Sequence, residues 1–148
     1  MLKDYLMEIF DRDIHKVITE LNSYSKEENI WLIKGDIKNS AGNLCLHLIG
    51  NLKYFIGSVL GNIDYERNRE AEFSGKGVPR EEIVKGLEET ITIVTGTLKN
   101  LNEKDFEGNF PHEIFKREMS TGSFMIHLVA HLNYHLGQMN YHRRFIDG

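Results

Sequence analysis

Four histidines recur at steps of four or seven residues in the stretch STGSFMIHLVAHLNYHLGQMNYH, from Ser120 to His142. This stretch contains no Asp, Glu, Lys or Arg, although these residues make up 27% of the chain. Read as an α-helix, it has a broad apolar face bordered by one narrow polar arc, formed by His127, His131, His135, Gln138 and His142. Residues four apart on a helix have Cβ atoms about 5–6 Å apart, so two imidazoles in this row could bind one metal ion.

Two pairs in the row have the required spacing, His127 with His131 and His131 with His135. The spacing does not choose between them, and His131 belongs to both. In the alternative interpretation the histidines are hydrogen-bonded side chains at the edge of an ordinary core and bind no metal. A third ligand from another helix would decide between the two interpretations.

Apolar residues at steps of three and four predict three further helices. These cover Leu2 to Leu21, about Ala41 to Leu60 with Ser40 or Asn39 as N-cap, and Pro79 to Leu101. The chain has two prolines and no long strand-like alternation, apart from a possible short extended piece at Ile114–Glu118. We therefore predict an all-α protein, an antiparallel four-helix bundle that forms one domain over residues 1–148.

The second predicted helix also carries a polar border beside its apolar face. His47 and Asn51 lie on this border, and Tyr54 lies just beyond it. If it faces the histidine row, His47 is the natural third ligand. Three neutral imidazoles leave a divalent ion with open positions, as in catalytic zinc sites, and nitrogen ligands suit Zn, Ni, Co, Cu or Fe(II).

Composition excludes several other classes of protein. The net charge is −4, so the chain has no basic field for nucleic acid or an anionic membrane. The Ser120–His142 stretch is too polar for a membrane span, and the charged N-terminus is unlike a signal peptide. A single cysteine, Cys45, excludes an internal disulfide and favours a cytoplasmic location.

Two features of the connecting segments have alternative interpretations. Trp31 could close one end of the bundle or form the wall of a pocket. The segment GNIDYERNREAEFSGKGVPR is rich in charges of alternating sign. It is expected to be a solvated loop with weak local ion pairs, or else to use Arg67 or Arg69 to bind an anionic substrate or to pair across a subunit interface.

Three motifs together resemble the DinB-like superfamily, and in particular an uncharacterised branch of it. They are HLIGN in the second helix, RNREAEF in the following segment and HLNYHLGQ in the last helix, in an order that covers nearly the whole chain. The resemblance implies a four-helix bundle, often dimeric, in which three residues hold one metal ion. Carried over by motif, the ligands are His47, His131 and His135, with Zn or Ni as the metals we expect first. His127, Asn51 and Gln138 become pocket or ligand-orienting residues, and we expect Tyr54 in the same pocket.

Some members of this superfamily are transferases or isomerases that use a low-molecular-weight thiol. The leading hypothesis is therefore a metal-dependent enzyme that transfers or adds a thiol to a small-molecule substrate, or hydrolyses it at metal-bound water. No general base can be identified in the sequence. The alternatives are a metal- or ligand-binding bundle without turnover, and a helical interaction module in which the histidines have no metal.

Overall fold

The computed structural model describes residues 1–148 and is built from helices without a single β-strand. The long elements are α1 (Leu2–Asn22), α2 (Ala41–Leu52), α4 (Arg80–Asn100) and α6 (Thr121–Ile146). A π-helix, η2 (Lys53–Leu60), continues α2, so the predicted second helix has the expected length but loosens in its last two turns. The prediction of an all-α four-helix bundle is confirmed.

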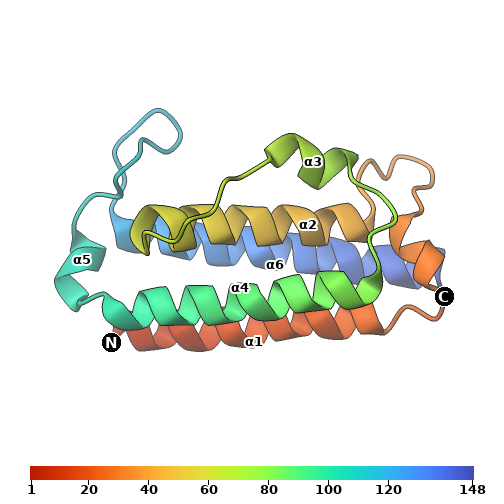
Figure 1. The fold of residues 1–148 in the computed structure, drawn as a ribbon, viewed down its shortest axis with the longest axis horizontal. Helices are drawn as coiled ribbons and strands as arrows, with labels where there is room; N and C mark the ends of the chain where they lie inside the picture. The colour runs from red at the N-terminus through yellow and green to blue at the C-terminus, as the bar shows by residue number, and fades with distance from the viewer.

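The four long helices pack as two pairs (Figure 1). α1 lies beside α4, α2 lies beside α6, and further contacts of α1 with α6 and of α2 with α4 close the bundle. α1 and α4 run in opposite directions, as do α2 and α6, whereas α2 and α4 run the same way. The parallel direction of α2 and α4 arises because the segment between them returns along the whole bundle before α4 begins (Figure 1).

A single cluster of 27 buried apolar residues fills the space between the helices. Leu44, Leu48 and Leu52 of α2 and Leu128 and Leu132 of α6 belong to it, each no more than 3% exposed. Burying one such side chain contributes about 1.5–3 kcal/mol. This apolar packing fixes how α2 and α6 face each other, and it therefore sets the relative position of the polar residues at their shared edge.

The segments predicted to be irregular contain two short helices. α3 (Arg69–Ser74) begins where the side chain of Asn68 accepts a hydrogen bond from the backbone N–H of Ala71. α5 (Glu103–Glu107) begins with a capping box formed by Asn102 and Asp105. Both caps satisfy backbone N–H groups that would otherwise lack partners at a helix start. The segment containing RNREAEF is therefore partly helical, which corrects the expectation of a solvated loop.

The expected extended piece at Ile114–Glu118 is a tight hairpin tip closed by an isolated bridge between Ile114 and Arg117. Phe115 and Lys116 form the turn with φ values of 54° and 58°, a left-handed conformation that non-glycine residues seldom adopt.

At the other end of the bundle, the 3₁₀-helix η1 (Glu27–Trp31) carries Trp31 against the first turn of α2. A Cβ at Gly42 would lie 2.7 Å from the Trp31 ring, so the indole packs directly on the helix backbone and covers this end of the bundle. Each helix is too short or too polar to cross a membrane.

Candidate metal centre

Two helices supply the three histidines that were predicted from the sequence as metal ligands. Ser40 caps α2 by accepting a hydrogen bond from the N–H of Asn43, and Ser120 caps α6 in the same way. His47 lies two turns into α2, and His131 and His135 lie one turn apart on α6. Because the leucines of both helices are buried against each other, these imidazoles meet at the edge of the core.

The three rings converge through their Nε2 atoms. Nε2 of His131 lies 3.1 Å from Nε2 of His47 and 3.1 Å from Nε2 of His135. One nitrogen from each of the three residues lies within 4.8 Å of the other two. The rings meet edge to face, so the nitrogens point to a common region and the rings do not stack on one another.

Hydrogen bonds on the far side of two rings determine where their protons lie. Nδ1 of His47 lies 3.0 Å from Oε1 of Glu72, and Nδ1 of His135 lies 2.7 Å from Oε1 of Gln138. A carboxylate oxygen and an amide oxygen can only accept, so in both neutral rings Nδ1 carries the proton. The Nε2 atoms of His47 and His135 therefore present lone pairs to the common region.

His131 supplies the third nitrogen, but the protein does not satisfy the hydrogen-bonding groups of its ring. Its Nε2 faces two lone pairs, and its buried Nδ1 has no hydrogen-bond partner. Either tautomer of the neutral ring leaves a donor or an acceptor without a partner, which is costly in a buried site. A cation shared by the three Nε2 atoms would remove the conflict at their common centre.

The distances also suit a divalent metal ion. With metal–nitrogen bonds of about 2.0–2.1 Å, nitrogens 3.1 Å apart subtend an angle of about 100° at the metal. This angle lies between the ideal tetrahedral and octahedral values. The angle fits the two pairs that His131 forms, and three protein ligands would leave a divalent ion with positions for water or a substrate.

Burial keeps these imidazoles neutral. Burial, together with the neighbouring His135 and His47, lowers the pKa of His131 to about 4. Burial also lowers the pKa of His47 and of His135, against the opposing effects of their hydrogen bonds with Glu72 and Gln138. Neutral imidazoles have the free lone pairs that metal binding requires, so the site is in the binding form at neutral pH.

Glu72 of α3 is the residue of this site that sequence reasoning missed. Its carboxylate is 5% exposed and forms a two-pronged ion pair with Arg67, with distances of 2.9 Å and 3.0 Å, while also accepting from His47. A carboxylate behind a metal-binding histidine fixes the ring orientation and makes the ligand more basic. Asn43 donates to the backbone oxygens of Glu72 and Gly75 and so holds α3 on α2.

Gly50 of α2 makes room for this carboxylate. A Cβ at Gly50 would lie 2.6 Å from Cδ of Glu72, closer than real atoms approach. The glycine in HLIGN and the glutamate in RNREAEF therefore fit together, with His47 beside both. The signal that could have identified Glu72 was its place within one of the three motifs that carried the resemblance.

Comparison with known proteins agrees with this architecture. Residues 3–148 match the family described as "Protein of unknown function (DUF1572)", which is a DinB-like family. The chain belongs to the DUF1572 family. Its fold is also similar to the crystal structure of a DinB-like protein from Bacillus cereus ATCC 10987, with a TM-score of 0.69 and 20% sequence identity. The likeness covers 92% of this chain and 89% of that chain. No curated protein matches the sequence.

The other predicted site residues of this DUF1572 protein lie around the three histidines, at different distances from them. Gln138 touches it directly through His135. Asn51 lies one turn after His47, is 7% exposed, and its Oδ1 has no hydrogen-bond partner. His127 lies one turn before His131, with ring centroids 6.5 Å apart, and its ring meets that of Phe115 from the hairpin tip.

The two arginines considered for anion binding have different surroundings. Arg67 donates through Nε and Nη2 to Glu72, and its guanidinium lies 6.0 Å from the ring centroid of Tyr54. This ion pair is largely buried, which corrects the expectation of weak, solvated pairs for the whole segment. Arg69 is exposed and lies 5.3 Å from the ring centroid of Phe73, which itself contacts His47.

The last histidine of the predicted row has a separate role. His142 is 4% exposed, its Nε2 donates to the backbone oxygen of Leu32 at 2.7 Å, and its Nδ1 accepts from the hydroxyl of Tyr24. Both ring nitrogens are satisfied within the protein. His142 therefore joins the 3₁₀ connector to α6 and lies outside the group of three.

Proposed function

We propose that the chain is a metal-dependent enzyme in which His47, His131 and His135 hold one divalent ion, with zinc or nickel the first candidates and iron, cobalt or copper the others. The observation that carries the proposal is the convergence of the Nε2 lone pairs of His47 and His135 on Nε2 of His131. Three neutral nitrogen ligands with a hydrogen-bonded carboxylate behind one of them suit such an ion.

The reaction we propose is transfer or addition of a low-molecular-weight thiol to a small-molecule substrate, with hydrolysis as the other reaction open to the same centre. A divalent ion held by three histidines lowers the pKa of a bound thiol or water and so supplies the nucleophile. Glu72 and Gln138 orient the ligands from behind, and Asn51 offers a buried amide oxygen with no protein partner to position a substrate donor.

A metal-binding bundle without turnover is the second candidate, and one observation favours it. The carboxylate of Glu72 is fully engaged with Arg67 and His47, so it is not free to accept a proton from a substrate. No general base has therefore been identified. This candidate shares the metal site and differs only in giving no product.

Metal analysis of protein purified without an affinity tag tests the site. We expect about one equivalent of metal in the wild type, its loss in His131→Ala, and its retention in His127→Ala, a matched change one turn away on the same helix. Retention of metal by His131→Ala, or a metal-free wild type after reconstitution with zinc and with nickel, would reject the proposal. Product formation from a panel of thiols with electrophilic and ester substrates then separates the enzyme from the non-catalytic bundle.

We also propose that the protein is cytoplasmic and forms a homodimer. In support of the location, the single cysteine, Cys45, is fully buried and has no disulfide partner. In support of the dimer, α6 exposes Ile126 (56%) and Tyr141 (71%) to solvent. Light scattering coupled to size-exclusion chromatography measures the mass, and replacing both residues by Ser should yield monomers. A wild-type monomer at micromolar concentration would rule the dimer out.

A further inference from the structure

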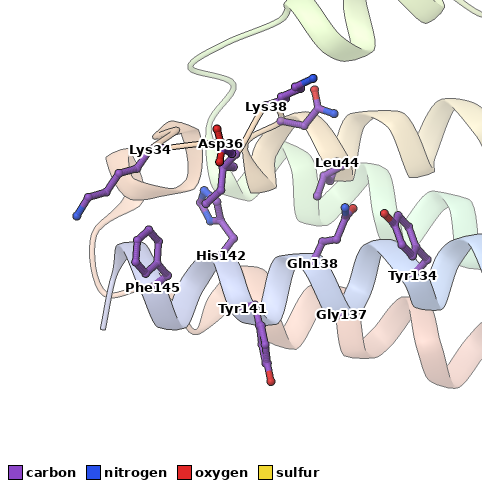
Figure 2. A pocket seen from close by; sticks show the side chains of 13 residues that line it. Lys34, Asp36, Lys38, Leu44, Tyr134, Gly137, Gln138, Tyr141, His142 and Phe145 are labelled. Carbon is purple, nitrogen blue, oxygen red and sulfur yellow. The ribbon is translucent and has the colours of Figure 1, made fainter.

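A cavity of about 990 Å³ opens next to the metal centre, between the connector of residues 34–39 and α6 (Figure 2). Pockets for organic ligands have volumes of about 300–1,000 Å³, so this cavity can hold a molecule of drug or metabolite size. It lies on the Leu44 and Gln138 side of the centre, and the three proposed ligands, His47, His131 and His135, do not line it.

Apolar residues line the cavity at both of its ends. Tyr134 and Phe145 of α6 line it together with Leu44 and Ile37, and the two aromatic residues are 65% and 60% exposed. Figure 2 shows both rings rising from α6 on the cavity side of the helix, at opposite ends of the cavity. They are eleven residues apart, which is about 16 Å along the helix axis. Aromatic side chains contribute most when their faces are covered, so each ring can take a flat apolar body placed against it.

The connector contributes an excess of positive charge. Lys34 and Lys38 line the cavity with one acidic residue, Asp36, and none of the three takes part in any ion pair of the chain. The ammonium of Lys34 lies 5.1 Å from the ring centroid of Phe145, so a cation and an aromatic ring lie next to each other at this end of the cavity. This combination favours an anion attached to an apolar body.

Gln138 links the cavity to the metal centre. Its amide oxygen is taken by Nδ1 of His135 at 2.7 Å, which leaves its NH₂ group as the donor available to a molecule in the cavity. Figure 2 shows the side chain of Gln138 directed toward Leu44 across the cavity. A ligand that accepts from this NH₂ group would hold the amide oxygen on His135, and so keep the lone pair of its Nε2 toward the centre.

We propose that this cavity is a binding site for a small aromatic carboxylate, coupled to metal binding through Gln138. The ring of the ligand packs on Tyr134 beside Leu44, and its carboxylate accepts from Gln138 on the side that faces Lys34 and Lys38 of the connector. Coupling between two binding sites is reciprocal, so the carboxylate raises metal affinity by the same factor by which the metal raises carboxylate affinity. The coupling rests on the proposed metal function, whereas the binding of the carboxylate does not.

Calorimetry on protein dialysed against EDTA tests the binding site alone. The probes are 2-naphthoate, 2-naphthalenemethanol and 2-naphthylmethylammonium, which share a ring system and differ in charge. We expect 2-naphthoate to bind at least about fivefold more tightly than the alcohol, and the double variant Lys34→Gln/Lys38→Gln to remove most of that preference. Equal affinities for the three probes, or a preference for the ammonium, would overturn the proposal.

Two glycine substitutions locate the probe. Gly137 lines the cavity on α6, and a Cβ there meets nothing within 4 Å, so Gly137→Leu can fill the cavity without disturbing the helix. Gly96→Leu is the matched control, because Gly96 is an exposed glycine of α4 that also meets nothing within 4 Å. We expect at least a tenfold loss of 2-naphthoate binding in Gly137→Leu only. Unchanged binding in Gly137→Leu would overturn the assignment. A loss of binding together with a change in oligomeric mass would also overturn it, because this face would then bind another copy of the chain.

Zinc affinity, measured by chelator competition with and without 2-naphthoate, tests the coupling. We expect a rise of threefold or more with the carboxylate, and no rise in Gln138→Met. Carboxylate binding without any effect on zinc affinity would overturn the coupling. If zinc fails to bind while 2-naphthoate still binds, the proposed metal function fails and the cavity site stands.

Discussion

The substitution Gly50→Ala tests whether the carboxylate of Glu72 is needed behind His47. A Cβ at residue 50 would lie 2.6 Å from Cδ of Glu72. Carbon atoms in contact lie about 3.5–4.0 Å apart, so the carboxyl group has to retreat by about 1 Å or more. The bond from Nδ1 of His47 to Oε1 of Glu72, now 3.0 Å, would then exceed hydrogen-bonding distance.

Two measurable effects follow from this displacement. Loss of the group that orients a metal-binding histidine lowers metal affinity by about 10- to 100-fold. Alanine stabilises a helix interior by about 0.5–1 kcal/mol over glycine, but moving a packed, buried carboxylate costs about 1–3 kcal/mol. We therefore expect Gly50→Ala to bind metal more weakly and to be no more stable than the wild type.

Zinc affinity by chelator competition and stability by urea denaturation measure the two effects. Gly96→Ala is the matched control, because it also replaces a helical glycine and its new methyl group meets nothing within 4 Å. We expect Gly96→Ala to gain stability and to keep wild-type zinc affinity. If Gly50→Ala behaves like Gly96→Ala in both measurements, the close fit of Glu72 against α2 is irrelevant to the centre and our reasoning is refuted.

Three further predictions concern charge, pH and backbone strain. Arg67→Met leaves the buried carboxylate of Glu72 without its ion-pair partner and should lower the free energy of unfolding in urea by about 3 kcal/mol; a loss below about 1 kcal/mol would contradict the buried pair. The pKa of His131 in the folded protein is about 4, below the unfolded value of 6.5, so the unfolded chain binds more protons between these values. The metal-free protein should therefore lose about 1–2 kcal/mol of stability as the pH falls from 6.5 to 4. This loss is smaller than the full pKa shift implies, because the ring is partly exposed. A urea midpoint that does not change over this pH range would contradict a neutral, buried ring. Lys116→Gly relieves a left-handed residue and should raise stability by about 0.5–1 kcal/mol in calorimetry, whereas a drop would show that the turn is not strained.

The sequence was sufficient for the long helices because their apolar periodicity is strong. The predicted limits of the first and last helices lie close to those of α1 and α6, and the edge position of His47 follows directly from its spacing to the leucines of α2. That His47 lies against His131 and His135 could be proposed from these patterns. It could not be established, because periodicity fixes the face of a residue on its own helix and not which helix it meets.

The supporting residues were harder to predict because their contacts depend on tertiary packing. Glu72 reads as one of many alternating charges, and only the return of the chain along α2 brings it to His47 and Arg67. The same return gives α2 and α4 a common direction, which connector length alone did not indicate. His142 resembled the other histidines of its row, and its buried bonds to Tyr24 and Leu32 depend on a connector that has no periodicity.

The separation of the histidines along the chain has a consequence for how the centre would be loaded. His47 and His131 are 84 residues apart, whereas His131 and His135 are one helical turn apart. During synthesis His47 has no partner ligands until the segment that forms α6 has left the ribosome. An ion captured by all three would thus mark a finished bundle, and a cell short of that ion would accumulate folded but unloaded chains.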